Sequence, residues 1–166
     1  MIGPIIGMWN AAPAARSNPN LISADPNAWH AKLNLTITGD ATAYDVAATA
    51  GSTATMLQTY YVATSTAMTL SLEMQNGNRG YAYVALYDGG SSLSEGNVVF
   101  ANGAWSGTAG VTVTDMGSGW RRVVMPVTTV VGHIIYAYAI FGGATEVAGA
   151  HVYVRKLKLE NGRAAT

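Results

Sequence analysis

The sequence contains no cysteine and very little charge. Without cysteine, the chain has no disulfide framework, no thiolate metal ligand and no cysteine nucleophile. A cysteine-free sequence also does not indicate whether the protein works in an oxidising or a reducing compartment. Nine Lys and Arg balance nine Asp and Glu, so only 11% of the 166 residues are charged, and no basic run is longer than Arg121-Arg122. Since binding to a phosphate backbone requires a basic patch, nucleic acid is not an expected partner.

The low charge also bears on self-association. Electrostatic repulsion between copies of a neutral chain is weak, so we expect the protein to be part of an assembly. The length of 166 residues argues for one domain, and a chain of this size can bury roughly 70% of its unfolded surface in a single core.

Two apolar stretches resemble export or membrane signals without meeting their requirements. Residues 1–15 end in small residues, but no basic segment precedes them, and Gly3, Pro4 and Gly7 interrupt the apolar run. Residues 123–145 carry no charge, yet proline, glycine and threonine divide them into two β-branched or aromatic runs. We predict two strands joined by a turn there, and no membrane insertion.

Apolar residues recur with a period of two along most of the chain, and no window of eleven or more residues holds a helical stripe. The clearest alternation covers residues 68–75, and residues 33–38 and 44–48 repeat it. About ten strands at regular spacing predict an all-β fold, an antiparallel β-sandwich with Greek-key or jelly-roll topology. The first 28 residues hold four of the five prolines and are expected to form an extended arm.

The sequence offers no recognisable catalytic pattern. Its three histidines and nine carboxylates lack the spacing of an acid/base pair. No serine lies in a Gly-x-Ser-x-Gly elbow, and residues 117–119 are better interpreted as a hairpin turn before Trp120. His133 and His151 are interpreted as ordinary strand residues. We therefore predict a non-enzymatic protein that has no catalytic residues and no cofactor.

Calcium is the metal that a β-sandwich of this composition could hold. Such folds often bind it through loop carboxylates and carbonyls, and the available oxygens belong to Asp25, Asp40, Asp88 and Glu160. No loop has the dense aspartate spacing of a strong site. We predict no metal ligands, and structural calcium stays open.

Aromatic residues are the most informative group, with nine Tyr and four Trp against two Phe. Rings with a polar tip favour interfaces, and a sugar-binding surface stacks such rings on pyranose faces. Trp105, in a glycine-rich loop, is expected to be more exposed, whereas Trp120 is expected in the core. Core packing is the alternative for each of the candidate carbohydrate-binding residues, which are Trp105, Tyr81, Tyr83, Tyr87 and Trp29.

The order of several segments resembles the carbohydrate-binding-module-like jelly-roll domains of tailed-bacteriophage virion proteins. Residues 20–22 (NLI) with Ala28-Trp29 resemble the opening of that family, and residues 70–74 (LSLEM) resemble one of its strands in altered form. Residues 113–123 (VTDMGSGWRRV) match its Asp, hydrophobic, Gly-x-Gly-Trp-x-Arg segment, with Arg121 where an aromatic residue is common. Residues 150–162 (AHVYVRKLKLENG) resemble its last strand.

This resemblance covers residues 20–166 and implies a jelly-roll domain there, preceded by an N-terminal docking arm over residues 1–19. It implies a non-catalytic protein located in the virion, a capsid decoration or head fibre. Its partners would be other capsid or tail proteins and copies of itself, as a homotrimer, with a host or environmental glycan as a further ligand. The alternatives are a tail-fibre module recognising host surface carbohydrate and a sugar-binding module of a secreted enzyme. The arm residues expected to dock are Ile2, Ile5, Ile6, Met8 and Trp9.

Overall fold

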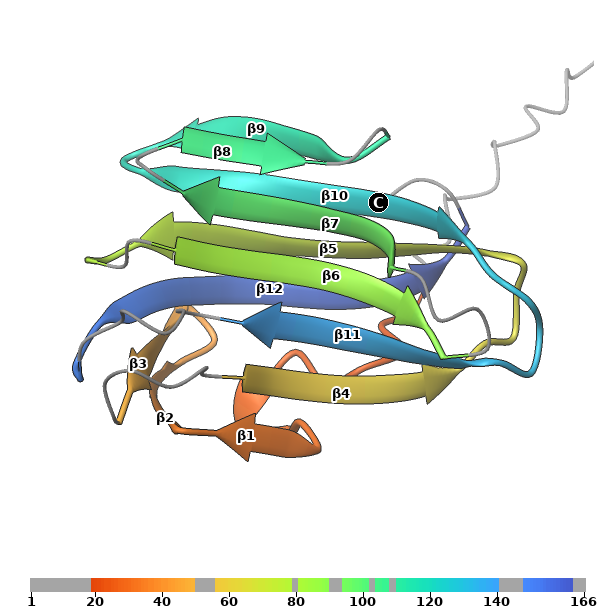
Figure 1. The fold of residues 1–166 in the computed structure, drawn as a ribbon, viewed down its shortest axis with the longest axis horizontal. Coiled ribbons are helices and arrows are strands. Elements are labelled where there is room, and N and C mark those ends of the chain that lie inside the picture. The colour runs from red at the N-terminus through yellow and green to blue at the C-terminus, as the bar shows by residue number, and fades with distance from the viewer. Residues whose placement is uncertain are drawn as a thin grey trace, which may run out of the picture.

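The computed structural model describes residues 19–49, 56–78, 81–89, 94–101, 104–107, 110–140 and 148–162 (Figure 1). These residues form twelve strands and one short 3-10 turn, η1 (Pro26–Ala28). All strand pairs are antiparallel and lie in two sheets, which confirms the predicted all-β sandwich. The five arm residues expected to dock lie outside the described residues, so the arm and its boundary at residue 19 stay predictions.

Two six-stranded sheets face each other, and we call them the front and rear sheets of Figure 1. The front sheet has the order β1 (Ala31–Leu33), β4 (Met56–Val62), β11 (Ile134–Ile140), β6 (Tyr81–Asp88), β7 (Ser94–Ala101) and β8 (Ala104–Gly107). The rear sheet has the order β2 (Leu35–Asp40), β3 (Ala43–Ala48), β12 (His151–Asn161), β5 (Ala67–Asn76), β10 (Trp120–Thr128) and β9 (Thr112–Gly117). Consecutive strands such as β4, β5 and β6 alternate between the sheets, as a jelly roll requires.

The core lies between the sheets and follows from the period-two alternation. On β5 the apolar residues Met68, Leu70, Leu72 and Met74 all point inward and are at most 3% exposed. Facing core residues of the front sheet include Leu57, Leu86 and Ile135. The polar residues of β5, Thr69, Ser71 and Glu73, are also buried, so this strand is covered on both faces.

The structure corrects the predicted strand over residues 33–38. Asn34 has a φ of 54°, in the left-handed region, and the extended backbone is interrupted there. β1 before it belongs to the front sheet and β2 after it belongs to the rear sheet. One apolar alternation therefore spans two strands, because alternation alone does not reveal a single residue at which the chain changes sheets.

The charge-free residues 123–145 contain most of β10 and all of β11 with a turn between them, as predicted. His133 N donates to the carbonyl of Val130 at 3.0 Å and closes this turn. Within the described part of the chain, no helix has the length and apolarity needed to cross a membrane.

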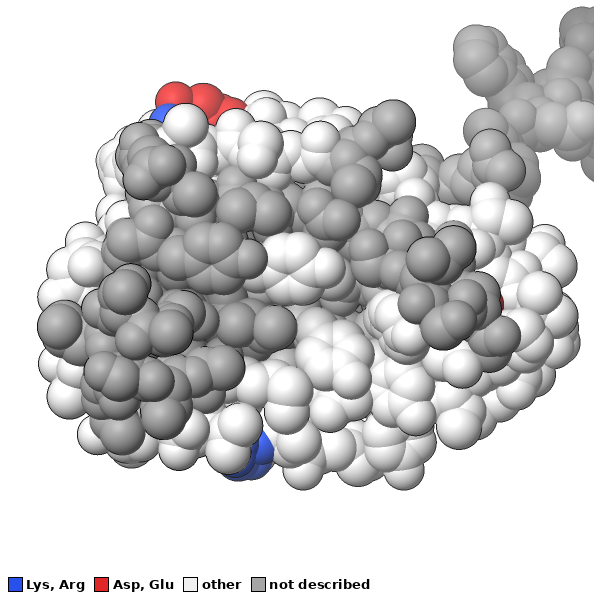
Figure 2. All heavy atoms as spheres, viewed as in Figure 1, with Lys and Arg blue, Asp and Glu red and all other residues white. Residues whose placement is uncertain are grey.

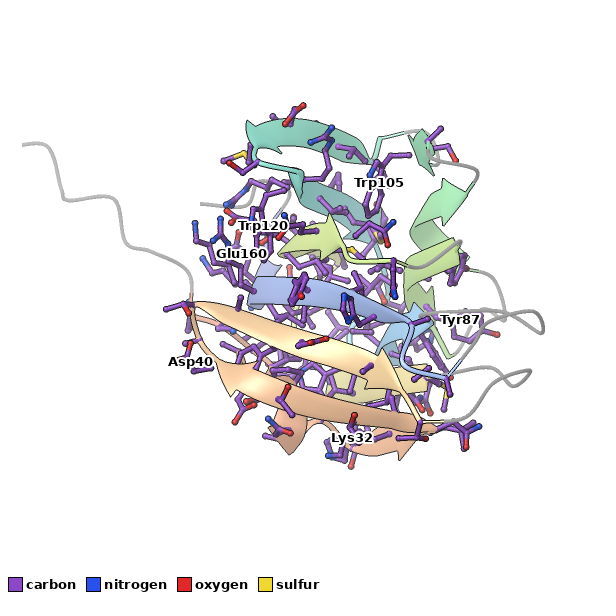
Figure 3. The ribbon with its side chains drawn as sticks, turned by 90° about the vertical axis from the view of Figure 1, so that its left-hand side faces the viewer. Lys32, Asp40, Tyr87, Trp105, Trp120 and Glu160 are labelled. Carbon is purple, nitrogen blue, oxygen red and sulfur yellow. The ribbon has the colours of Figure 1, made fainter. Side chains whose placement is uncertain are left out.

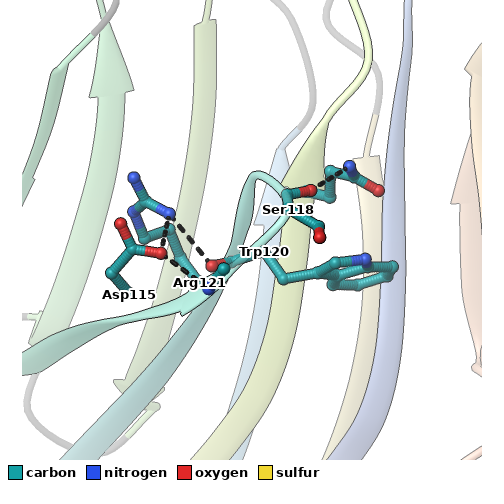
Figure 4. A network of polar contacts seen from close by, with 6 residues as sticks. Asp115, Ser118, Trp120 and Arg121 are labelled. Atoms are coloured by element: carbon teal, nitrogen blue, oxygen red, sulfur yellow. Dashed lines mark hydrogen bonds and ion pairs between the residues drawn. The ribbon is translucent and has the colours of Figure 1, made fainter.

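The Asp115 to Arg121 segment forms the β9–β10 hairpin and confirms the predicted turn (Figure 4). Ser118 and Gly119 both have positive φ, 51° and 80°, which is the backbone of a tight two-residue hairpin turn. Asp115 Oδ1 accepts hydrogen bonds from Gly117 N at 2.8 Å and from Arg121 Nη1 at 2.7 Å. The glycine-rich motif therefore shapes this turn.

Candidate functional site

A row of three tyrosines crosses the middle of the front sheet. Tyr136 on β11 lies opposite Tyr60 on β4 and opposite Tyr87 on β6. Because side chains alternate along a strand, Tyr138 points to the same side as Tyr136, while Ile135 and Ala137 point into the core and are 1% exposed. The outer side of three neighbouring strands thus bears a cluster of tyrosines.

The rings of this cluster lie in mutual contact range. The ring centroids of Tyr60 and Tyr136 are 6.4 Å apart, those of Tyr87 and Tyr136 6.5 Å, and those of Tyr136 and Tyr138 6.0 Å. Tyr87 and Tyr138 meet edge to face at 6.4 Å and 88°. Such arrangements are the favourable ones for aromatic pairs, so the rings hold each other in position.

His30 extends the cluster beyond β4. Its ring lies 4.0 Å from that of Tyr60, and its Nδ1 shares a 3.1 Å hydrogen bond with the hydroxyl of Thr59. We call the set of His30, Tyr60, Tyr87, Tyr136 and Tyr138 the tyrosine face. Gln58 adds a side-chain amide to the tyrosine face, because Gln58 on β4 lies directly opposite Tyr138 on β11.

A hollow of about 240 Å³ adjoins the tyrosine face and is lined by Gly89, His133, Ile134 and Tyr136. A Cβ atom at Gly89 would lie 2.8 Å from Cε2 of Tyr136, so glycine makes room for this ring. His133 is fixed by a 2.8 Å hydrogen bond from Nδ1 to the buried carboxylate of Asp88. The other Asp88 oxygen accepts a 2.6 Å hydrogen bond from Thr129 Oγ1. The hollow therefore has a rigid polar wall.

The front surface is almost free of charge over its described residues. In Figure 2 the described surface is white across its middle, with blue and red atoms at the upper left, blue at the lower edge and a little red towards the right. Burial raises the pKa of the Tyr138 hydroxyl, and the neighbouring Tyr136 and Tyr87 raise it further. A ligand of this face would meet tyrosine rings and hydroxyls, the His30 imidazole and an amide.

The structure brings only some of the predicted sugar-binding residues together. Tyr87 belongs to the tyrosine face, and Tyr83 points outward from the same strand, opposite Ile140. The side chain of Tyr81 lies outside the described residues, although its backbone begins β6. Sequence reasoning missed His30, Tyr60, Tyr136 and Tyr138. The alternating tyrosines of residues 134–140 were a signal, but the neighbours of β11 could not be known from it.

Two tryptophans among the predicted sugar-binding residues lie elsewhere. Trp29 is 4% exposed and belongs to the core, where its Nε1 donates to the carbonyl of Ser23 at 2.9 Å. The sugar-stacking role predicted for Trp29 is wrong, since no face of a buried ring is open to a ligand. Trp105, on β8, is half-buried and packs against the core rather than standing exposed. Figure 3 shows Trp105 away from Tyr87.

Trp120 also differs from expectation, because it is half-buried instead of lying in the core. Its ring lies under the guanidinium of Arg155, whose Cζ is 3.9 Å from the ring centroid. This contact is a cation–π interaction, which covers one side of the ring. Figure 3 places Trp120 and Glu160 on the opposite side of the sandwich from Tyr87.

The four carboxylates considered for calcium do not form a site in the described ranges. These ranges hold no group of three or more His, Asp or Glu side chains arranged to bind a metal ion. Glu160 Oε2 is paired with Lys158 Nζ at 2.5 Å, and Asp40 Oδ1 accepts two hydrogen bonds from Thr42.

No family model matches the sequence, and no curated protein is similar to it. Solved structures of similar fold include a sialidase, at a TM-score of 0.55 and 8% identity over 78% of this chain and 16% of that chain. They also include a CBM4 structure, at a TM-score of 0.49 and 7% identity over 77% of this chain and 78% of that chain. A further one is a carbohydrate-binding module (CBM6cm-2) from Cellvibrio mixtus lichenase 5A in complex with cellotriose, at a TM-score of 0.46 and 12% identity over 83% and 98% of the two chains. At these identities the likeness concerns the fold alone.

Proposed function

We propose that the chain is a carbohydrate-binding protein that holds glycan on the tyrosine face. The observation that carries this proposal is the row Tyr60, Tyr136 and Tyr87 across three adjacent strands. Pyranose rings have apolar faces that stack on aromatic rings, while their hydroxyls need polar partners at the ring edge. Tyrosine supplies both, since it combines an apolar body with a polar tip.

The surroundings of the row support a neutral sugar over other ligands. The absence of charge from the middle of this face among its described residues disfavours nucleic acid and charged peptides, which need complementary charge. Gln58 and His30 flank the tyrosines and add directional hydrogen-bonding groups. The hollow beside Tyr136, about 240 Å³, has room for a sugar substituent against Gly89.

Binding to a glycan panel tests the proposal directly. Wild-type protein should retain neutral oligosaccharides, and Tyr136→Ala should abolish retention because Tyr136 contacts both neighbouring rings. Tyr153→Ala is the matched control, because this tyrosine lies on β12 of the rear sheet. Equal loss in both variants, or no binding of wild type to any neutral glycan, would overturn the proposal.

A virion location is the second part of the proposal, and it rests on the resemblance of residues 20–166 to phage virion jelly rolls. In this role the arm over residues 1–19 docks a capsid decoration or head fibre, as a homotrimer, and the tyrosine face is presented outward. The alternative is a tail-fibre module that uses the same face to recognise host carbohydrate. Removing residues 1–15 should abolish incorporation into particles, and normal occupancy of the truncated protein would contradict docking by the arm.

A further inference from the structure

A second surface of interest lies on the outer side of the rear sheet, opposite the tyrosine face (Figure 3). It arises from a β-bulge in β12. Arg155 pairs with Glu73 and Lys158 pairs with Ser71, so β12 has one residue more than β5 between these pairs. Lys156 takes up the extra residue with a φ of 54°, a conformation that is costly for lysine.

The bulge changes which side chains face outward. In a regular strand Arg155 and Lys156 would point to opposite sides. Here Leu157 turns inward and is 2% exposed, while Lys156 is displaced to the outer side. Three cations of one strand therefore share the outer side, and Arg122 joins them from β10. We call Arg122, Arg155, Lys156 and Lys158 the basic cluster.

The basic cluster covers two buried carboxylates. Glu73 Oε2 accepts from Arg155 Nε at 2.7 Å, and Glu73 Oε1 accepts from Lys156 Nζ at 2.9 Å. Arg122 Nη1 lies 3.6 Å from Glu73 Oε1, which is longer than a hydrogen bond. Lys158 is paired with Glu160. Four cations against two carboxylates leave a local charge of +2 on a chain whose net charge is zero.

The cations of the basic cluster lie nearer the protein surface than the two carboxylates do. The side chains of Glu73 and Glu160 are 1% and 0% exposed, whereas the four cations are 21% to 60% exposed. The carboxylates lie beneath, and the guanidinium and ammonium groups lie above them. This surface therefore attracts anions, although each cation has a partner inside the protein.

A hollow of about 260 Å³ opens at the basic cluster and is lined by Asn20, Ser71, Arg122, Lys156, Leu157 and Lys158. Three of its six lining residues are cations, and Asn20 and Ser71 add polar side chains. Its volume is close to the lower end for ligand pockets, which suits a single acidic group or one acidic sugar unit.

We propose that this hollow is an oxyanion-binding site, which takes a carboxylate, sulfate or phosphate group between Arg122, Lys156 and Lys158. The planar guanidinium of Arg122 donates two parallel hydrogen bonds to such a group, and the ammonium groups contribute point charges. This site is distinct from the tyrosine face, lies on the other sheet and does not depend on the proposed function. A purely structural ion-pair network, holding β5, β10 and β12 together, is the rival explanation.

Titration of the full chain with small anions separates these explanations. Sodium sulfate, phosphate and glucuronate are added separately, with chloride replaced so that the ionic strength stays at about 0.15 M. Changes in the NMR chemical shifts of backbone amides report where each anion binds. Glucose serves as the uncharged reference. We expect saturable shifts at residues 71, 122 and 156–158, and the tightest of the three anions identifies the acidic group of the natural ligand.

Charge-removing variants complete the test. Lys156→Gln and Arg122→Gln should each weaken oxyanion binding by about tenfold or more, the value of a lost charged hydrogen bond. Lys32→Gln on β1 is the matched control and should leave binding unchanged, as should Tyr136→Ala. Lys156 is 60% exposed, so Lys156→Gln decides the matter even if Arg122→Gln fails to fold. Absence of saturable binding for all three anions, or equal weakening by Lys32→Gln, would overturn the site.

Discussion

The side-chain amide of Asn20 donates a 2.9 Å hydrogen bond to the carbonyl of Leu157, 137 residues further along the chain. Its other side-chain atom, Oδ1, accepts from Leu159 N at 2.9 Å and from Ile22 N at 3.3 Å. Leu157 lies in the β12 bulge, outside the regular pairing with β5. Asn20 therefore gives hydrogen-bond partners to Leu157 and Leu159 in the part of β12 beyond Val154, the last residue that pairs with β3.

Replacing Asn20 by alanine should destabilise the sandwich. The change removes the side-chain partner of the Leu157 carbonyl and the Leu159 amide, and the loss of these part-buried hydrogen bonds costs about 1 kcal/mol. Urea unfolding of Asn20→Ala measures this cost. Asn27→Ala is the control, because Asn27 is exposed like Asn20 but bonds Asp25 and Lys32 through its backbone, and its effect should be within about 0.5 kcal/mol. Equal stability of the two variants would show that the hydrogen bonds of Asn20 do not stabilise the sandwich.

Local pattern predicts the strands of this fold well and predicts their assembly poorly. Alternation located β5 and β3, since the apolar positions of each face one core. It could not separate β1 from β2 at Asn34, because a positive φ at asparagine leaves no mark on the alternation. It also missed β8, whose four residues, 104–107, are too few to show a period. Strand order depends on pairing between segments far apart in the chain, which the local alternation of residues does not determine.

Glu73 should contribute to the loss of stability in acid. Burial raises the pKa of this carboxyl, but hydrogen bonds and charge from Lys156 and Arg155 outweigh burial and bring the pKa below its ordinary value of 4.5. The folded state thus binds the proton less well than the unfolded state. The contribution of Glu73 is present above pH 4.5 and is lost as the pH falls through the lowered folded-state pKa.

Comparing wild type with Glu73→Gln across this pH range checks that statement. At pH 7 the variant should be less stable by about 1–3 kcal/mol, less than for a fully buried pair because the cations are partly exposed. The difference should shrink as the pH falls below 4.5 and through the lowered folded-state pKa of the wild-type carboxyl. A difference that stays constant from pH 7 to pH 3 would contradict the lowered pKa.

The candidate site shows a further limit of sequence interpretation. Tyr87 was predicted from its residue type and belongs to the tyrosine face, whereas Trp29 was predicted on the same grounds and is buried. Residue type gives the chemistry that a side chain offers, but the side of the sheet decides whether a ligand can reach it. Tyr60 and Tyr136 became part of one site only through the pairing of β4 with β11.

Gly89→Ala should impair glycan binding on the tyrosine face while sparing the fold. The new methyl group would meet Tyr136 Cε2 at 2.8 Å and the Ile134 carbonyl at 3.1 Å, so the ring must move. The Tyr136 ring contacts those of Tyr60, Tyr87 and Tyr138, so its displacement disturbs the whole row. Calorimetric titration with a glycan that the wild type retains should show affinity reduced by about tenfold. Unchanged affinity, with an unchanged melting temperature, would mean that the hollow beside Tyr136 is not used.

Tyr138 should titrate at a higher pH than an exposed tyrosine. Burial raises its pKa above the ordinary value of 10.0, and the nearby Tyr136 and Tyr87 add to the shift. The folded state therefore holds the phenolic proton more tightly than the unfolded state. The resulting stabilisation is present below pH 10.0 and disappears as the pH rises through the folded-state value. Burial also raises the pKa of Tyr44, so tyrosinate absorbance near the alkaline end should show one late-titrating ring fewer in Tyr138→Phe than in the wild type. Tyr153→Phe on the rear sheet should leave the late titration unchanged. Loss of a late-titrating ring in Tyr153→Phe would contradict its assignment to Tyr138.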